Sequence, residues 1–169
     1  MIKIFKYFIQ SLVIYLFFLI GFIIRLKISR KIFSNLFRLV GSFLKSNKLI
    51  ENNIKIFSPN ISQIEKKKII DSMWKNYGMT FIEYIFLSNF RKKNSHIKIN
   101  NEELLLEIFE KQESVIFVSG HFANFELMSM EIVKKNIKLA TIYRPLNNIF
   151  LNPFMEYLRK KYVCPNQIK

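Results

Sequence analysis

The chain opens with an apolar stretch that no charged residue interrupts. Leu, Ile and Phe dominate Tyr7–Ile24, and basic residues flank the stretch on both sides. A helix needs about 20 predominantly apolar residues to cross a bilayer, and this stretch is close to that length. It lacks a small-residue cleavage site, so we expect residues 1–30 to form a retained membrane anchor. The alternative is a helix that lies in the membrane interface.

A second pattern follows the anchor, because apolar residues recur at helical spacing on one stripe with basic residues elsewhere. The apolar members are Ile32, Phe33, Leu36, Phe37, Val40, Phe43 and Leu44. This pattern predicts an amphipathic helix that lies on the membrane surface or packs against the rest of the chain. We assign residues 31–60 to this juxtamembrane segment, with residues 51–60 as a connection.

Residues 61–169 carry the signals of a folded domain. Ser62 and Glu65 have the spacing of a capping box, in which each residue satisfies a backbone N–H at a helix start. They predict a helix over residues 64–87, and Gly78 is the position at which this helix would bend.

The second half of that expected helix, residues 79–87, is apolar apart from Glu83. Such a run is expected in a core, or alternatively along a slot for an apolar ligand. A carboxylate in apolar surroundings usually has a partner, so Glu83 is expected to have one.

Strands and helices alternate over the remainder of the chain. The expected strands are residues 97–99, 115–119 and 139–143, and the expected helices are residues 100–110, 125–135 and 152–161. Pro153 falls in the first turn of the last helix, where a missing N–H is tolerated. The alternation predicts an α/β fold with a mixed, partly parallel sheet, whose sites lie at the carboxyl ends of strands.

The strand expected at residues 115–119 ends at Gly120 and is followed by His121 and Glu126. On one helix His121 and Glu126 would point apart, so His121 is placed before the helix and Glu126 in its first turn, with Asn124 as N-cap. A carboxylate bonded to one imidazole nitrogen raises basicity at the other, as a general base for an alcohol requires. On spacing alone, an ordinary loop histidine and helix-start glutamate is the commoner arrangement.

Two stretches, Gly120–Leu127 and Tyr143–Asn148, resemble the late lipid A biosynthesis acyltransferases of the lysophospholipid acyltransferase superfamily. Members of that family commonly carry glycine and tryptophan where this chain has Ala123 and Phe125. The upstream segment Trp74–Gly78 is similar to the region before the catalytic half of these enzymes.

This resemblance implies a reaction and roles for the residues. A fatty acyl group would pass from an acyl carrier protein thioester to a hydroxyl of a phosphorylated lipid A precursor, with no cofactor and no metal. His121 would be the general base and Glu126 would orient it. Arg144 would clamp a phosphate. Tyr143 and Asn124 would complete the substrate site, Asn124 more as a helix cap than as an oxyanion donor.

Family members are longer than this chain, so residues 61–169 are expected to be the N-terminal part of an acyltransferase domain whose C-terminal part is missing. Direct acyl transfer needs no covalent nucleophile. Ser119 precedes His121 closely, but strand alternation would point its side chain away from the imidazole.

The net charge of +15 narrows the choice of partners. Lys, Ile, Asn and Phe are abundant and Ala is rare, as an AT-rich genome would impose, so part of the lysine excess reflects composition. The remainder favours anionic partners, namely membrane lipids, a phosphorylated glycolipid and acyl carrier protein. No zinc-finger or RNP pattern points to nucleic acid.

The cysteines and histidines of the chain argue against an intrachain disulfide and against a metal site. Cys164 is the only cysteine, so the chain forms no intrachain disulfide. His96 and His121 are the two histidines, and neither has a second histidine or cysteine at the spacing of a metal site.

Basic residues also predict the membrane topology. Arg25, Lys27, Arg30 and Lys31 follow the apolar stretch, against Lys3 and Lys6 before it. The positive-inside rule then favours a single-pass protein of a bacterial inner membrane, with the catalytic domain facing the cytoplasm.

Two other functions compete with this interpretation. One is an acyltransferase acting on glycerol phosphate or another glycolipid, although glycerol-phosphate enzymes usually carry aspartate at the position of Glu126. The other is an inactive, truncated fragment that only binds membranes.

Overall fold

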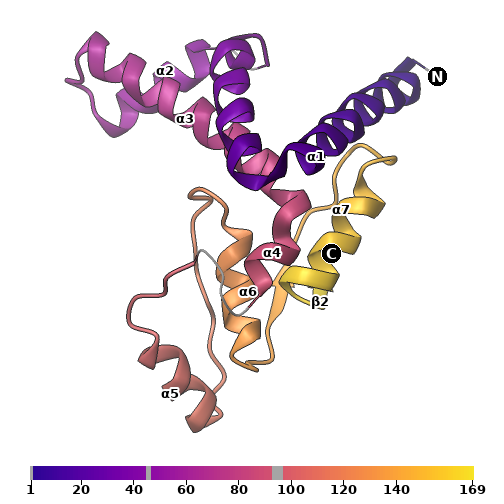
Figure 1. Ribbon diagram of the computed structural model, residues 1–169. Helices are drawn as coiled ribbons and strands as arrows, with labels where there is room; N and C mark the ends of the chain where they lie inside the picture. The colour runs from indigo at the N-terminus through magenta and orange to yellow at the C-terminus, as the bar shows by residue number, and fades with distance from the viewer. Residues whose placement is uncertain (1, 45–46, 93–96) are drawn as a thin grey trace. The chain divides into compact units, whose positions relative to one another are not determined.

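The computed structural model describes residues 2–44, 47–92 and 97–169 (Figure 1). The fold is mostly helical, and the described residues contain one small parallel sheet. The elements in chain order are α1 (Ile2–Leu44), α2 (Asn47–Phe57), α3 (Gln63–Glu83), η1 (Tyr84–Phe86), α4 (Leu87–Arg91), α5 (Glu103–Lys111), α6 (Glu126–Lys134), β1 (Ala140–Ile142), α7 (Asn152–Leu158), η2 (Arg159–Val163) and β2 (Asn166–Ile168).

The chain divides into two compact units. The first unit comprises Met1–Leu19 and Tyr84–Lys169, and the second unit comprises Ile20–Glu83. Helix α1 therefore contributes to both units, and the residues expected at the active site all belong to the first.

Helix α1 is interrupted at Arg25, whose backbone torsions (φ 66°, ψ 159°) are not helical. The Ser29 hydroxyl lies 2.7 Å from both the Gly21 and the Arg25 carbonyl oxygens, so it takes over the bonding that a regular turn would supply. By length and apolar composition α1 could cross a membrane, a criterion that buried core helices and signal sequences also meet. The anchor expected over residues 1–30 stays a prediction, and it contains this break.

The capping box is confirmed at the start of α3. The Glu65 amide donates to Ser62 Oγ at 3.2 Å, and the Ser62 amide donates to Glu65 Oε2, also at 3.2 Å. The helix ends at Glu83 and continues as the 3₁₀ turn η1 and the short helix α4. The single helix predicted up to residue 87 is therefore wrong in its last turn.

The connection predicted at residues 51–60 is also wrong, because most of it belongs to α2. Ile50 and Ile54 are four residues apart and place apolar side chains on one face of that helix, and Ile50 is buried. That periodicity defines the element more strongly than Pro59, which lies beyond its end.

In the second unit, α1 and α3 approach closely at Gly78. A Cβ on Gly78 would meet the backbone carbonyl of Phe33, so only glycine fits there without a shift. Phe81 packs against Phe33 and Phe37, with ring centroids 5.9 and 5.3 Å apart. Helix α3 runs through Gly78 without a break, and close packing accounts for this glycine.

Glu83 has the partner that its apolar surroundings require. Its Oε1 lies 2.9 Å from Arg30 Nε, and its side chain is 8% exposed. This expectation is confirmed within the second unit. Ile82 beside it is fully buried. In the first unit Leu87 is fully buried and Phe86 is nearly so, and the run over residues 79–87 therefore forms core.

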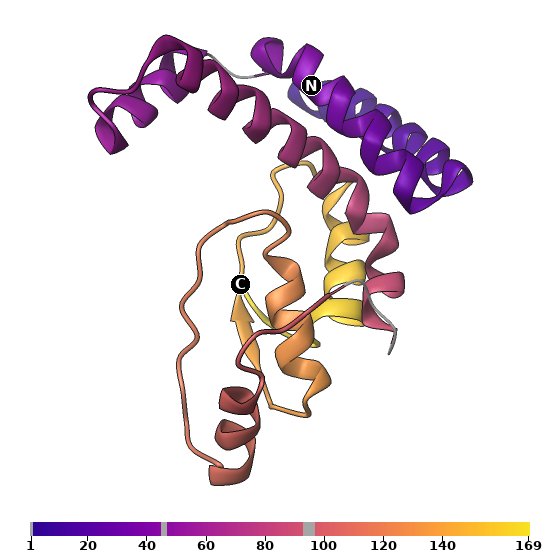
Figure 2. The ribbon, with the colours of Figure 1, turned by 60° about the vertical axis from the view of Figure 1, so that its left-hand side comes forward.

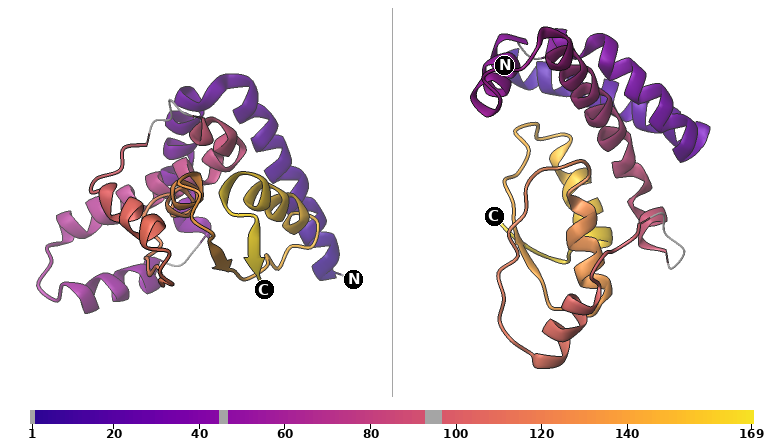
Figure 3. Two further views of the ribbon diagram at one scale, coloured as in Figure 1. Left: turned by 90° about the horizontal axis from the view of Figure 1, so that it is seen from below. Right: turned by 90° about the vertical axis from the view of Figure 1, so that its left-hand side faces the viewer.

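Strands β1 and β2 pair in parallel, with Ala140 opposite Asn166 and Ile142 opposite Ile168. Helices α6 and α7 lie on one face of the pair (Figure 3). The strand predicted at residues 139–143 is confirmed, and so is a parallel pairing. Strand β2 was missed, because the polar Asn166-Gln167 lacks the β-branched signal of a strand.

The strands predicted at residues 97–99 and 115–119 are wrong. The segment before α6 is extended but belongs to no ladder among the described residues, and it runs apart from the helices (Figure 2). Ile116 and Val118 are 92% and 90% exposed. β-Branched composition stabilises a strand only where a neighbour supplies hydrogen bonds and packing, so an α/β domain with a mixed sheet is not confirmed.

The remaining helices differ from prediction at their ends. Helix α5 begins at Glu103 rather than Asn100, because Asn101 adopts a left-handed conformation (φ 56°). Helix α7 begins at Asn152 with Pro153 in its first turn, as predicted. Its predicted last turn is the π-helical segment η2.

Candidate active site

Glu126 is the first residue of α6 and is 6% exposed. An acidic side chain in the first turn is stabilised by the helix dipole, which favours a helix start there. The N-cap position is held by Phe125, which makes no side-chain cap bond, so the helix starts one residue later than predicted. Asn124, expected as the cap, is buried and accepts the Leu127 amide through its backbone carbonyl.

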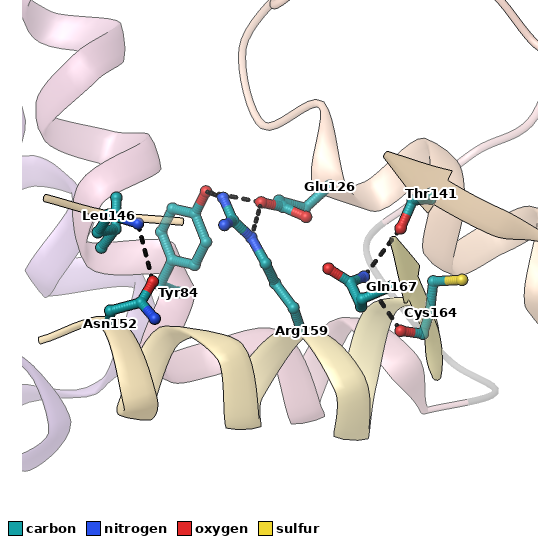
Figure 4. A network of polar contacts seen from close by, with 8 residues as sticks. All are labelled: Tyr84, Glu126, Thr141, Leu146, Asn152, Arg159, Cys164 and Gln167. Carbon is teal, nitrogen blue, oxygen red and sulfur yellow. Dashed lines mark hydrogen bonds and ion pairs between the residues drawn. The ribbon is translucent and has the colours of Figure 1, made fainter. Parts of the chain in front are cut away.

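The Glu126 carboxylate is held by two side chains from distant parts of the chain (Figure 4). Arg159 Nε lies 2.6 Å from Glu126 Oε1, and the Tyr84 hydroxyl donates to the same oxygen at 2.9 Å. Arg159 also donates to the Tyr84 oxygen at 3.3 Å. The three side chains therefore form a closed cluster contributed by η1, α6 and η2.

Burial sets the electrostatics of this cluster. The Glu126 and Arg159 side chains are 7% and 13% exposed, so neither charge is well solvated and each depends on the other. Burial and the neighbouring Glu126 charge raise the pKa of Tyr84, which stays a neutral donor. Burial alone would lower the pKa of Arg159, but the Glu126 charge and the Tyr84 hydroxyl offset this and raise it.

Sequence reasoning missed Arg159 and Tyr84. They lie 33 and 42 residues from Glu126, so no local spacing connects them. In the structure Arg159 opens a π-helical segment, a rare element that often marks functional sites, but the sequence carries no local signal for it.

His121 lies in the loop before α6 and is exposed. Its ring packs against Phe125 at a tilt of 54°, with centroids 4.2 Å apart. The two partners found for Glu126 are Arg159 and Tyr84, so a hydrogen bond that His121 donates to Glu126 stays a prediction. His96 lies outside the described residues.

A cavity of about 1290 Å³ brings most of the expected site residues together within the first unit. Its polar border includes His121, Glu126, Tyr143, Arg144 and Arg159. Apolar side chains supply much of the rest, among them Val115, Phe117, Ile132, Leu139 and Ile142. Apolar walls with a few converging charged groups suit a ligand that has both a hydrocarbon chain and an anionic part.

The expected substrate residues hold different positions around this cavity. Arg144 is exposed, so its guanidinium is available to a ligand. The Tyr143 ring lies against Arg159, with the guanidinium carbon 5.9 Å from the ring centroid. Asn124 is buried and is not among the residues that border the cavity. In the described part of the chain, no three His, Cys, Asp or Glu side chains gather as metal ligands.

The family model of the bacterial lipid A biosynthesis acyltransferases matches residues 1–163. The chain belongs to this family. No curated protein and no solved structure matches the chain. The match begins at the first residue and ends at Val163, the last residue of η2, so it covers the apolar helix as well as the residues of the candidate site.

Family membership supports a general acyltransferase activity, and it implies that the group that receives the acyl chain belongs to a glycolipid. It also agrees with membrane association through the long apolar helix α1.

Ala123 is where this acyltransferase departs most clearly from the pattern it resembles. Its φ is 48°, in the left-handed region that glycine adopts without strain. The Phe122 amide donates to the Gly120 carbonyl at 2.9 Å, so the chain already turns tightly at His121, two residues before Ala123. The glycine common at this position in the family therefore has a conformational reason, and alanine carries strain in its place.

Proposed function

We propose that this acyltransferase moves a fatty acyl group from an acyl carrier protein thioester to a hydroxyl of a lipid A precursor. The observation that carries the proposal is the shared border of one apolar-walled cavity by His121, Glu126 and Arg144. The family match supports the reaction class and the kind of acceptor.

In the proposed step, the acceptor hydroxyl oxygen attacks the thioester carbonyl carbon while its proton passes to His121. The tetrahedral intermediate then expels the carrier thiolate, which takes up that proton, so a C–O bond forms and a C–S bond breaks. Positioned acid–base groups of this kind contribute about 10² to 10⁴ in rate.

Glu126 orients and stabilises the imidazolium in this mechanism. Arg159 and Tyr84 both bind Oε1. We assign the other oxygen, Oε2, to the imidazole. Catalytic hydrogen bonds are often long before substrate binds, and we expect this one to form when the acceptor enters the cavity.

Arg144 is assigned to an acceptor phosphate. A guanidinium grips phosphate with two parallel hydrogen bonds and stays charged at working pH, and Arg144 is exposed at the cavity border. Tyr143, which also borders the cavity, is assigned to the same substrate site, and its ring contacts Arg159.

The partners and the location follow from charge. A net charge of +15 favours an acidic carrier protein as donor and an anionic membrane surface. We place the N-terminal part of α1 at the cytoplasmic interface of a bacterial inner membrane, with the cavity facing the cytoplasm.

The experiment is release of free carrier thiol from acyl carrier protein thioester, measured with and without lipid A precursor. The wild-type chain should release thiol only with acceptor, and His121→Ala should lower the rate by about 10²-fold or more. Ser119→Ala is the matched control: Ser119 is exposed, two residues away and outside the mechanism, so its rate should not change. Equal loss in both variants would contradict the assignment of His121.

A further inference from the structure

The loop between Arg144 and α7 combines an uncharged sequence with an unusual position. No charged residue occurs between Arg144 and Glu156. Within the first unit this loop lies against the N-terminal part of α1, which is itself uncharged after Lys6.

Contacts from both backbone and rings hold the loop to α1. The Asn148 side-chain amide donates to the Tyr7 carbonyl at 2.8 Å, and the Tyr15 hydroxyl donates to the Phe150 carbonyl at 2.8 Å. Phe150 packs edge-on against Phe8, with ring centroids 5.5 Å apart. The loop and the helix therefore present their outer side chains as one surface.

Those outer side chains are mostly apolar. On the loop, Ile149 is 57% exposed, Phe150 is 37% exposed and Leu146 is 36% exposed. On the helix, exposed side chains include Phe5, Phe8, Ile9, Leu12 and Leu16. Asn147 is the exposed polar residue of the loop. An apolar surface of this extent on two adjoining segments marks an interaction site.

The loop backbone satisfies many of its own polar groups. Asn148 Oδ1 accepts the Phe150 and Leu151 amides at 3.0 and 3.2 Å, and Asn152 Oδ1 accepts the Leu146 amide at 2.8 Å. Pro145, at the start of the loop, has no N–H to satisfy. Unpaired backbone polar groups are costly in the hydrocarbon region, so these bonds lower the cost of placing the loop at the boundary between headgroups and acyl chains.

We infer that the loop of residues 145–151 inserts into a lipid bilayer beside the N-terminal part of α1. The partner is lipid because the surface is continuous with a helix that has the length and composition to enter a membrane. Asn148 binds the backbone next to Lys6, so the loop tip lies level with the basic end of that helix, where headgroups meet acyl chains. This inference does not depend on the proposed reaction.

The test attaches an environment-sensitive bimane dye to single cysteines in a Cys164→Ser background. Ile149→Cys probes the loop, and Leu104→Cys on α5 is the matched control because it is an apolar residue of similar exposure, 55%, in the same unit. The labelled full chains are placed in phosphatidylethanolamine–phosphatidylglycerol vesicles, with and without bromine on the acyl chains. Circular dichroism checks that each labelled chain keeps its helices, and Phe150→Cys replaces Ile149→Cys if that one does not.

If the loop inserts, we expect the emission of the bimane at the loop position to shift to shorter wavelength in vesicles and to be quenched where the acyl chains carry bromine. The bimane at Leu104 should show neither change. Aqueous emission at the loop position, with quenching by iodide equal to that at Leu104, would overturn it. Equal bromine quenching at both positions would overturn it as well, since the chain would then adsorb to lipid without using this loop. Neither outcome requires acyl transfer, so the result is independent of the proposed function.

Discussion

The Glu126 carboxylate is held by Arg159 and Tyr84, and the consequence of losing one partner can be measured. Arg159→Ala leaves a buried carboxylate without its cation, which should lower the free energy of unfolding by about 3 kcal/mol. Denaturant unfolding in detergent followed by circular dichroism checks this value. Arg144→Ala is the control, because Arg144 is exposed and its loss should change stability by no more than about 0.5 kcal/mol. Equal stability of the two variants would contradict a buried ion pair.

Strain at Ala123 makes a second prediction at this scale. Its positive φ costs about 1 kcal/mol for alanine and little for glycine, so Ala123→Gly should maintain or raise the unfolding midpoint. Ala123→Val places a β-branched side chain in the same conformation and should lower it. A midpoint that falls in Ala123→Gly and is unchanged in Ala123→Val would show that the turn is not strained.

Tyr84 should make stability depend on pH in the alkaline range. Burial and the Glu126 charge raise its pKa above the ordinary 10.0, so above pH 10 the unfolded state loses a proton that the folded state keeps. Stability from this group is complete below pH 10 and falls above it, by about 1.4 kcal/mol per pH unit. Tyr84→Phe should show a correspondingly smaller fall in unfolding free energy between neutral and alkaline pH. Identical slopes in the two proteins would rule out a raised pKa.

At the residue scale, sequence identifies what is local. His121, Glu126, Tyr143 and Arg144 were predicted as site residues because their spacing and neighbours form short patterns, and all four border one cavity in the structure. The contacts of Glu126 with Arg159 and Tyr84 could not be predicted, because only tertiary folding brings these residues together.

At the scale of elements, the sequence predicted helices more accurately than strands. The capping box before α3 needs only four adjacent residues, and its hydrogen bonds are present. The strand at residues 115–119 needs a hydrogen-bonding neighbour that its own composition does not supply, and it was wrong. Strand β2 forms from polar residues because β1 lies beside it.

The capping box can be tested on its own. Ser62→Ala removes the oxygen that accepts the Glu65 amide and should lower the free energy of unfolding by about 1 kcal/mol. Ser72→Ala is the control on the same helix: Ser72 is exposed and within α3, where alanine is the better helix former. Unfolding curves of both variants check the difference, and a loss in Ser72→Ala equal to that in Ser62→Ala would contradict a specific cap.

For the whole molecule, the family match over residues 1–163 runs through both compact units. The family was predictable because two short motifs identify it. The extent of the sheet was not, because strand pairing depends on neighbours that no single segment specifies. The arrangement of α1 against the loop of residues 145–151 also follows only from tertiary contacts.

The central proposal is acyl transfer at the cavity that His121 borders, with His121 as the general base. The direct measurement is mass spectrometry of the glycolipids formed when membranes containing this chain meet acyl carrier protein thioester and lipid A precursor. We expect a product heavier by one acyl group from the wild-type chain, with a loss of about 10²-fold or more in His121→Ala. Absence of product from the wild-type chain, or the same amount of product from His121→Ala, would contradict the account.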